Sequence, residues 1–307
     1  MNLDIKIATR ESYGKKLVEL GKKNNDIVVL DADLAAATKT IDFKKEFPNR
    51  FFDMGIAEQD MMSTAAGLAT CGKIPFASTF AIFAAGRSYD QIRNSICYPN
   101  LNVKICATHA GISVGEDGAT HQMLEDISLM RTLPNMTVIS VSDDIQTKWA
   151  VEEILKINGP VYLRLGRLAS PVIYDESQKF EIGKGIQLGN GTDATVIATG
   201  LMVAEAIKAM EELKNKGINI RVVDIHTIKP IDKELIIKCA KETKKIITIE
   251  DHSIIGGLGS AVCEVLSEEY PCKVTRLGMK DTFGKSGKAE KLLEYFGLNK
   301  DGIIKEI

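Results

Sequence analysis

The sequence predicts an α/β protein with two domains, each a mostly parallel sheet flanked by helices. Its 307 residues are enough for two domains that each bury their own core. Short apolar runs alternate with helix-like segments along the whole chain, which is the pattern of parallel sheets with crossover helices. A polar, glycine-containing stretch interrupts this alternation once, so we expect two domains rather than one.

The first domain is expected to span residues 1–170. Its predicted strands are the apolar runs at residues 27–30, 74–77, 103–107, 137–141 and 161–163. The predicted helices between them cover residues 12–23, 57–70, 83–96 and 143–157. The last of these begins at Asp143, whose side chain suits an N-cap.

Residues 171–191 are predicted to be a linker, because they hold Pro171, a polar stretch at 175–179 and several glycines. The second domain is then expected at residues 192–307. Its predicted strands cover residues 194–198, 220–223 and 245–249, and its predicted helices cover residues 203–216, 233–242 and 260–269.

Charge and hydropathy exclude several classes of protein. Lys and Arg together number 39 and Asp and Glu 41, so the net charge of -2 gives no reason to expect binding to nucleic acid or to an anionic membrane. No apolar run approaches the roughly 18 residues of a membrane span, and the first residues lack the apolar core of a signal peptide. The six cysteines include no CxxC pair. These features predict a cytoplasmic protein.

Polar residues of the first domain follow several predicted strands. Open α/β sheets place their binding sites at the edge where parallel strands end. The segments concerned are residues 7–10 with 31–34, residues 52–59, residues 78–83, and residues 108–111 with 115–122.

Glu58 follows a glycine turn and begins a predicted helix whose next residues are largely apolar. As an exposed residue of the first turn it would favour the helix dipole. As a carboxyl held in an apolar pocket it could instead stay protonated and donate a hydrogen bond. Phe80 and Phe83 are three residues apart and share a helix face or entry, so they could pack in the core or offer a shelf to a flat cofactor ring.

Two histidines, His109 and His121, lie in a glycine-rich segment that also contains Asp117. Such residues offer proton transfer and hydroxyl recognition near neutral pH. A structural loop is an alternative, and a zinc site is a weaker one because the two histidines are poorly spaced. Arg10 and Arg167 lie at the ends of predicted elements, where they could bind phosphate or form surface ion pairs.

Taken in order, these segments resemble transketolases over nearly the whole chain. Each motif is weak alone, whereas the ordered series is specific. The motifs are Ala8-Thr9-Arg10, Ala32-Asp33-Leu34, Gly55-Ile56-Ala57-Glu58, Ser78-Thr79-Phe80, Thr108-His109, Gly115-Glu116-Asp117-Gly118-Ala119-Thr120-His121-Gln122 and Arg131-Thr132-Leu133-Pro134-Asn135. The chain is thus similar to the C-terminal half of a transketolase, a pyrimidine-binding domain followed by the family's C-terminal domain.

The resemblance implies thiamine diphosphate as cofactor. Glu58 matches the glutamate that hydrogen-bonds the aminopyrimidine ring and makes the cofactor reactive. Phe83, with Phe80 beside it, matches the aromatic pair that packs on this ring. Other implied cofactor neighbours are Asp33, Leu34 and Ile56.

The implied reaction moves a two-carbon ketol unit from a ketose phosphate to an aldose phosphate. His109 and His121 match residues that contact the sugar hydroxyls and help their proton transfers, and Asp117 matches the carboxylate that reads the donor's C2 hydroxyl. Arg10 and Arg167 match the arginines that hold the terminal phosphate. Two positions depart from the family: Gly86 replaces an aromatic residue, and Ala37 a phosphate-binding hydroxyl.

The family holds Mg²⁺ and the diphosphate with a Gly-Asp-Gly string followed by Asn. The nearest string here, Glu116-Asp117-Gly118, belongs to the sugar site. We therefore expect no metal ligand in this chain, and a partner of transketolase N-terminal type that binds Mg²⁺ and shares the thiamine diphosphate, in an α2β2 heterotetramer.

Alternatives remain for the function. The chain could be the β subunit of a 2-oxo-acid dehydrogenase, part of a deoxyxylulose-phosphate-synthase-like enzyme, or a non-catalytic assembly subunit. In the second domain, Glu250-Asp251-His252 followed by Gly256-Gly257-Leu258-Gly259 could suggest a nucleotide loop, but the spacing favours a packing turn between strand and helix. We assign this domain no site residue.

Overall fold

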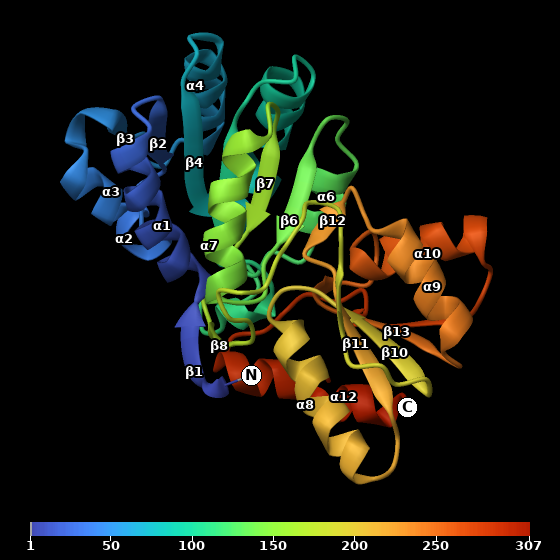
Figure 1. Cartoon of the computed structure of the whole chain (residues 1–307). Helices are drawn as coiled ribbons and strands as arrows, with labels where there is room; N and C mark the ends of the chain where they lie inside the picture. The colour runs from blue at the N-terminus through green and yellow to red at the C-terminus, as the bar shows by residue number, and fades with distance from the viewer. Residues whose placement is uncertain (1) are drawn as a thin grey trace.

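The structure is a computed structural model that describes residues 2–307, and its larger sheet has seven strands (Figure 1). Every pair from β6 to β3 is parallel, whereas the short edge strand β12 runs antiparallel to β6. The parallel α/β class predicted from the alternating pattern is therefore confirmed. The strand order is β12 (Thr227–Lys229), β6 (Thr137–Ser140), β7 (Val161–Arg164), β5 (Lys104–Thr108), β4 (Ile74–Phe80), β2 (Ile27–Asp31) and β3 (Phe51–Asp53).

Helices cover both faces of this sheet because its strands are apolar on both sides. In β2, Val28 and Leu30 join one hydrophobic cluster, and Ile27 and Val29 join another, as the alternation of side chains along a strand requires. The first cluster includes α4 (Glu58–Thr70). The second includes α1 (Thr9–Lys23) and α7 (Asp144–Glu153), which pack against each other (Figure 1).

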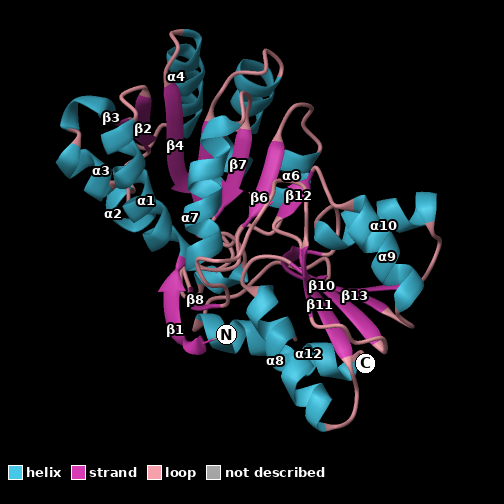
Figure 2. Ribbon diagram, viewed as in Figure 1, coloured by secondary structure: helices cyan, strands magenta, loops and turns pink. Residues whose placement is uncertain are grey.

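A second sheet of five strands forms the other domain (Figure 2). Its order is β14 (Val274–Met279), β13 (Ile246–Ser253), β10 (Ala194–Ala198), β11 (Ile220–Asp224) and β9 (Ile186–Leu188). Only β9 is antiparallel to its neighbour. Helices α8 (Met202–Asn215) and α12 (Lys300–Lys305) pack together on one side, and α9 (Lys233–Glu242) and α10 (Leu258–Glu269) on the other.

The two domains are tied together by their strands and by buried polar groups. Although β12 follows β11 in the chain, it pairs with β6 and so extends the first sheet. Strand β1 (Asn2–Ala8) pairs with β8 (Ala169–Val172) in a separate two-stranded sheet. Arg164, which forms an ion pair with Asp126 of its own domain at 2.7 Å, donates across to the Asp251 carbonyl of the second domain at 2.8 Å.

Several elements differ from the sequence prediction. Strand β9 lies within the stretch expected to be a linker. The helix expected at residues 83–96 is instead two wide π-helical turns, Ile82–Arg87 and Ile92–Cys97, around the short α5 (Tyr89–Gln91). At the end of the first of these turns, Ser88 Oγ donates to the carbonyls of Phe83 and Ala84, so a side chain competes there with regular helical bonding.

Further short elements were not expected from the sequence. They are the strands β1, β3, β8, β12 and β14, and the helices α2 (Ala35–Thr38), α3 (Ile41–Glu46), α6 (Asp126–Arg131), α11 (Ala289–Tyr295) and α12. Within residues 2–307, no helix is both long and apolar enough to cross a membrane.

Candidate cofactor and substrate site

The predicted site residues of the first domain gather where the strands of the larger sheet end. Asp33 and Leu34 follow β2, Ile56 and Glu58 follow β3, and His109 follows β5. Because these strands are parallel and adjacent, their carboxyl ends lie at one edge of the sheet. The remaining predicted residues that lie at or near this edge are Arg10, Phe80, Phe83, Asp117, His121 and Arg167.

Glu58 is a buried carboxyl at the first position of α4. Its side chain is 1% exposed, so its interpretation as a solvent-exposed helix residue is wrong. Arg87 Nη1 donates to Glu58 Oε2 at 2.7 Å, and the Arg87 side chain is 45% exposed. The sequence did not point to Arg87, because the two residues are 29 positions apart and come from different elements.

An aromatic cluster lies along the same edge. The rings of Phe80 and Phe83 are stacked with centroids 6.0 Å apart, and Phe80 stacks on the His109 ring at 3.8 Å. His121 meets Phe83 edge-on at 5.6 Å. Phe80 is 8% exposed, whereas Phe83 is only half-buried and has the Arg87 guanidinium 4.4 Å from its ring centre. The cluster therefore has a buried member, Phe80, and a more accessible one, Phe83.

His109 is held as a neutral ring. Burial, and then the positive charges of Arg10 and Arg167, lower the pKa of His109 to about 3. Arg10 Nη1 lies 3.4 Å from His109 Nε2, and because a guanidinium can only donate, Nε2 accepts. The ring proton then resides on Nδ1, which lies 2.9 Å from Thr108 Oγ1. His109 thus serves as a fixed polar group rather than a cation.

Arg10 and Arg167 come together because the Gly166 amide donates to Thr9 Oγ1 at 2.8 Å. Both arginines line a cavity of about 310 Å³. Arg10 Nη1 donates to the Ala37 carbonyl at 2.8 Å, and Arg167 Nη1 lies 3.0 Å from Glu116 Oε2. Within the described chain, Arg10 Nε is a buried donor that has no hydrogen-bond partner. The cavity is therefore suited to an anion.

The second domain contributes to this cavity through Lys288, Ala289 and Glu290. Lys288 is exposed, so the lining holds three positive side chains against the two carboxylates of Glu116 and Glu290. The sequence analysis missed it because it lies in a polar turn without an apolar pattern or a recognisable motif.

Asp251 from the second domain holds the loop that follows His109 and leads to Asp117 and His121. Its Oδ1 accepts from the Ile112 amide at 2.9 Å and its Oδ2 from the Ser113 amide at 3.3 Å. Gly111 packs so closely that an added Cβ would lie 2.1 Å from Asp251 Oδ2. The same loop is anchored at its far end, where Gln122 Nε2 donates to the Lys285 carbonyl at 2.8 Å. The second domain therefore supports the site, although we had assigned it no site residue.

The remaining predicted residues lie on the open rim. Asp33 and Asp117 are exposed, Leu34 and His121 are half-buried, and the Ile56 side chain is 77% exposed. The turn that carries Leu34 is held by the carboxyl group of Asp31. This group is buried, and burial raises its pKa to about 6. Hydrogen bonds to Asp31 come from the Leu34 amide and from the hydroxyls of Thr38 and Thr40.

Glu250 binds the backbone amides of the glycine-rich turn in the second domain. Its carboxylate oxygens accept from the backbone amides of Leu258 at 2.6 Å and Gly259 at 2.8 Å. These amides begin α10, so a side chain already occupies the place where a nucleotide phosphate would bind. The turn is a packing turn, as the sequence favoured.

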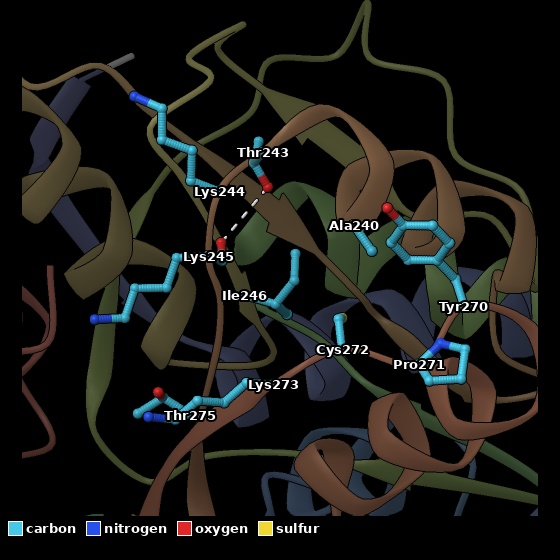
Figure 3. Close-up of a pocket in the computed structure, with 10 residues that line it drawn as sticks. All are labelled: Ala240, Thr243, Lys244, Lys245, Ile246, Tyr270, Pro271, Cys272, Lys273 and Thr275. Atoms are coloured by element: carbon cyan, nitrogen blue, oxygen red, sulfur yellow. Dashed lines mark hydrogen bonds between the residues drawn. The ribbon is translucent and has the colours of Figure 1, made fainter.

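A cavity of about 440 Å³ lies in the second domain, where β13 and β14 begin (Figure 3). It is lined by Lys244, Lys245, Tyr270 and Cys272 among others, without a carboxylate or a histidine. Figure 3 shows the side chains of Lys244 and Lys245 directed away from Tyr270. Among the residues that the structure describes, no three His, Cys, Asp or Glu side chains are placed to hold a metal ion.

Comparison with known families gives two matches that together span most of the chain. The family described as transketolase, pyrimidine binding domain, matches residues 5–172, and the family described as transketolase, C-terminal domain, matches residues 183–303.

Individual relatives fall into two groups by length. A putative transketolase C-terminal section from Methanocaldococcus jannaschii is 54% identical, and the alignment covers 97% of this chain and 94% of that protein. One subunit of an apulose-4-phosphate transketolase from Phocaeicola vulgatus is 41% identical, with 97% and 96% covered. Human transketolase is 40% identical over 98% of this chain, but this spans only 49% of the human protein.

A solved structure described as a split gene transketolase, inactive beta4 tetramer, is also similar to this chain. It is 56% identical, superimposes with a TM-score of 0.91, and covers 97% of this chain and 96% of its own.

Proposed function

The chain belongs to the transketolase family, and from this premise we propose that it is one subunit of a two-chain, thiamine-diphosphate-dependent transketolase. Such an enzyme transfers a two-carbon ketol unit from a ketose phosphate to an aldose phosphate. The observation that carries the proposal is the buried Glu58 carboxyl, which Arg87 bridges to the Phe83 ring, together with two histidines that pack on Phe80 and Phe83 and an arginine-lined cavity.

The residues present fit thiamine diphosphate. Glu58 would hydrogen-bond the aminopyrimidine, and Phe83 would support the face of this ring. When bound, the cofactor supplies the carbon nucleophile that carries the two-carbon unit. Leu34 and Ile56 would be apolar neighbours of the cofactor, and Asp33 an acid on the exposed rim.

We assign the substrate-binding roles of the remaining residues from their charge and burial. His109, whose pKa of about 3 keeps it neutral, would accept or donate hydrogen bonds to sugar hydroxyls without adding charge. His121 lies nearer the rim, where it can exchange protons with the sugar during transfer. Asp117 would bind a donor hydroxyl, and Arg10 and Arg167 would bind the terminal phosphate.

The proposed enzyme also needs a group that binds Mg²⁺ and the diphosphate. We propose that a subunit of transketolase N-terminal type supplies this group and that the two chains form an α2β2 assembly. Two observations support a partner: relatives of matching length are described as a section and as a subunit, and apolar side chains are exposed on the cofactor rim. These are Ile56, at 77% exposed, and Phe52, at 40%.

Reconstitution tests the function. Mixing the chain with the N-terminal-type subunit, thiamine diphosphate and Mg²⁺ should give two-carbon transfer from a ketose phosphate to ribose 5-phosphate. Glu58→Ala should abolish most of this transfer, whereas Glu234→Ala, at a side chain 86% exposed, should not change it. An undiminished Glu58→Ala mixture would contradict the mechanism.

A further inference from the structure

Arg87 contacts both of the groups that the proposed function assigns to the aminopyrimidine ring. Its Nη1 is 2.7 Å from Glu58 Oε2, and its guanidinium carbon is 4.4 Å from the centre of the Phe83 ring. A single side chain thus bridges the buried acid and the accessible aromatic face.

The guanidinium matches this position chemically. Like an aminopyrimidine, it is planar, delocalised and bears N–H donors, and it both stacks on aromatic rings and hydrogen-bonds carboxylates. While Arg87 donates to Glu58 Oε2, that oxygen accepts and does not donate. Arg87 and the cofactor therefore cannot use Glu58 Oε2 and the same face of the Phe83 ring at the same time.

The two partners of this ion pair differ in freedom. Glu58 is 1% exposed and fixed at the start of α4, whereas 45% of the Arg87 side chain surface faces solvent. Arg87 can therefore rotate into solvent without a change in the helix, and Glu58 cannot. A buried carboxylate without a partner is costly, so Arg87 compensates Glu58 while the cofactor is absent.

We propose that Arg87 is a further residue of the cofactor site, which occupies the place of the aminopyrimidine in the cofactor-free subunit and competes with it for Glu58 and Phe83. Arg87 thereby determines how tightly the enzyme takes up thiamine diphosphate. This inference rests on the proposed function. The opposite model, in which Arg87 stays on Glu58 and helps it hold the cofactor, predicts an affinity change of opposite sign.

The test measures cofactor affinity in the reconstituted two-subunit complex. Arg87→Met removes the guanidinium and keeps much of the side-chain volume, so thiamine diphosphate should bind about tenfold more tightly at fixed Mg²⁺, because one hydrogen bond to a charged group no longer has to be broken. Calorimetric titration gives the dissociation constant directly. Unchanged or weaker binding by Arg87→Met would overturn the proposal.

Two matched variants control for charge and for folding. Arg93→Met removes one positive charge from an exposed arginine whose side chain donates to Asn94, and should leave the affinity unchanged. If Arg93→Met tightens binding as much as Arg87→Met, charge and not competition is responsible. Circular dichroism spectra that match the wild type would show that each variant is folded, and Arg87→Lys, which keeps the charge but cannot stack as a plane, should bind with intermediate affinity.

A second probe separates this inference from the function itself. The free pyrimidine half of the cofactor, 4-amino-5-hydroxymethyl-2-methylpyrimidine, should bind the Arg87→Met chain more tightly than the wild-type chain. Adding Glu58→Gln to Arg87→Met should remove the gain. Equal affinities of wild type and Arg87→Met would refute the competition, whereas an undiminished double variant would refute the role of Glu58.

Discussion

Replacement of Gly111 by alanine tests how the second domain supports the substrate loop. Gly111 has φ 81° and ψ -179°, a backbone region that is essentially restricted to glycine. An added Cβ would also lie 2.1 Å from Asp251 Oδ2, closer than any real contact. Backbone strain of about 1–3 kcal/mol and overpacking of about 1–3 kcal/mol together predict a loss of about 2–6 kcal/mol in the free energy of unfolding.

Gly72→Ala is the matched control. Gly72 has the same φ of 81°, but no atom lies within 4 Å of the position its Cβ would take. It should therefore lose only about 1 kcal/mol. Urea denaturation, followed by far-UV circular dichroism, measures both losses. If Gly111→Ala is no more destabilising than Gly72→Ala, the close contact between the loop and Asp251 is refuted.

Three further predictions concern the anion cavity, His109 and the turn below Leu34. Arg10→Met and Arg167→Met should each raise the KM of the reconstituted enzyme for a phosphorylated substrate about 10- to 100-fold, because each removes hydrogen bonds to a charged group. Lys288→Met, at an exposed side chain, should raise this KM only about threefold. The KM for an unphosphorylated sugar should not change, and equal increases for both sugars would contradict the phosphate assignment. Because the pKa of His109 is lowered to about 3, the unfolded chain takes up a proton near pH 6.5 and the folded chain does not, so the free energy of unfolding falls as pH drops from about 6.5 toward 3. The NMR signals of the His109 ring should not titrate between pH 8 and 5. A titration midpoint near 6.5 would refute the burial argument. Thr38→Val removes the hydroxyl that donates to Asp31 at 2.6 Å and should lower the free energy of unfolding by about 1–3 kcal/mol. Thr70→Val, at an exposed helix end, should lower it by less than about 1 kcal/mol. Urea denaturation measures both losses, and similar values would contradict the role of Asp31.

The sequence predicted those strands whose apolar character is continuous. Residues 27–30 and 194–198 read as buried strands and form β2 and β10, because strands covered on both faces are apolar at every position. Strands β9 and β12 have three residues each and were missed, since so short a run carries no periodic signal. Which sheet β12 joins is decided by tertiary contacts and not by its own residues.

The local shape of the cofactor edge was less predictable. The region around Phe83 has helical spacing, yet Ser88 hydroxyl bonds to preceding carbonyls accompany wide turns there. Arg87 lies over the Phe83 ring in this segment. Local propensity does not specify such competition between a side chain and the helix backbone.

The candidate site residues were predicted from the ordered series of motifs, which carries information that composition and periodicity do not. The supporting partners Asp251 and Lys288 were missed because each reaches the site from a distant segment, and Arg87 was missed because its partner Glu58 is 29 residues away. Asp251, for example, is 139 residues from the Ile112 amide that it binds. Contacts of this kind depend on how the two domains pack.

The most direct test of a shared cofactor site is equilibrium binding of thiamine diphosphate, with Mg²⁺ present, to this chain, to the N-terminal-type subunit, and to their mixture. We predict tight, Mg²⁺-dependent binding only in the mixture, and its weakening when the chain carries Glu58→Ala. Tight Mg²⁺-dependent binding by this chain alone would contradict the account.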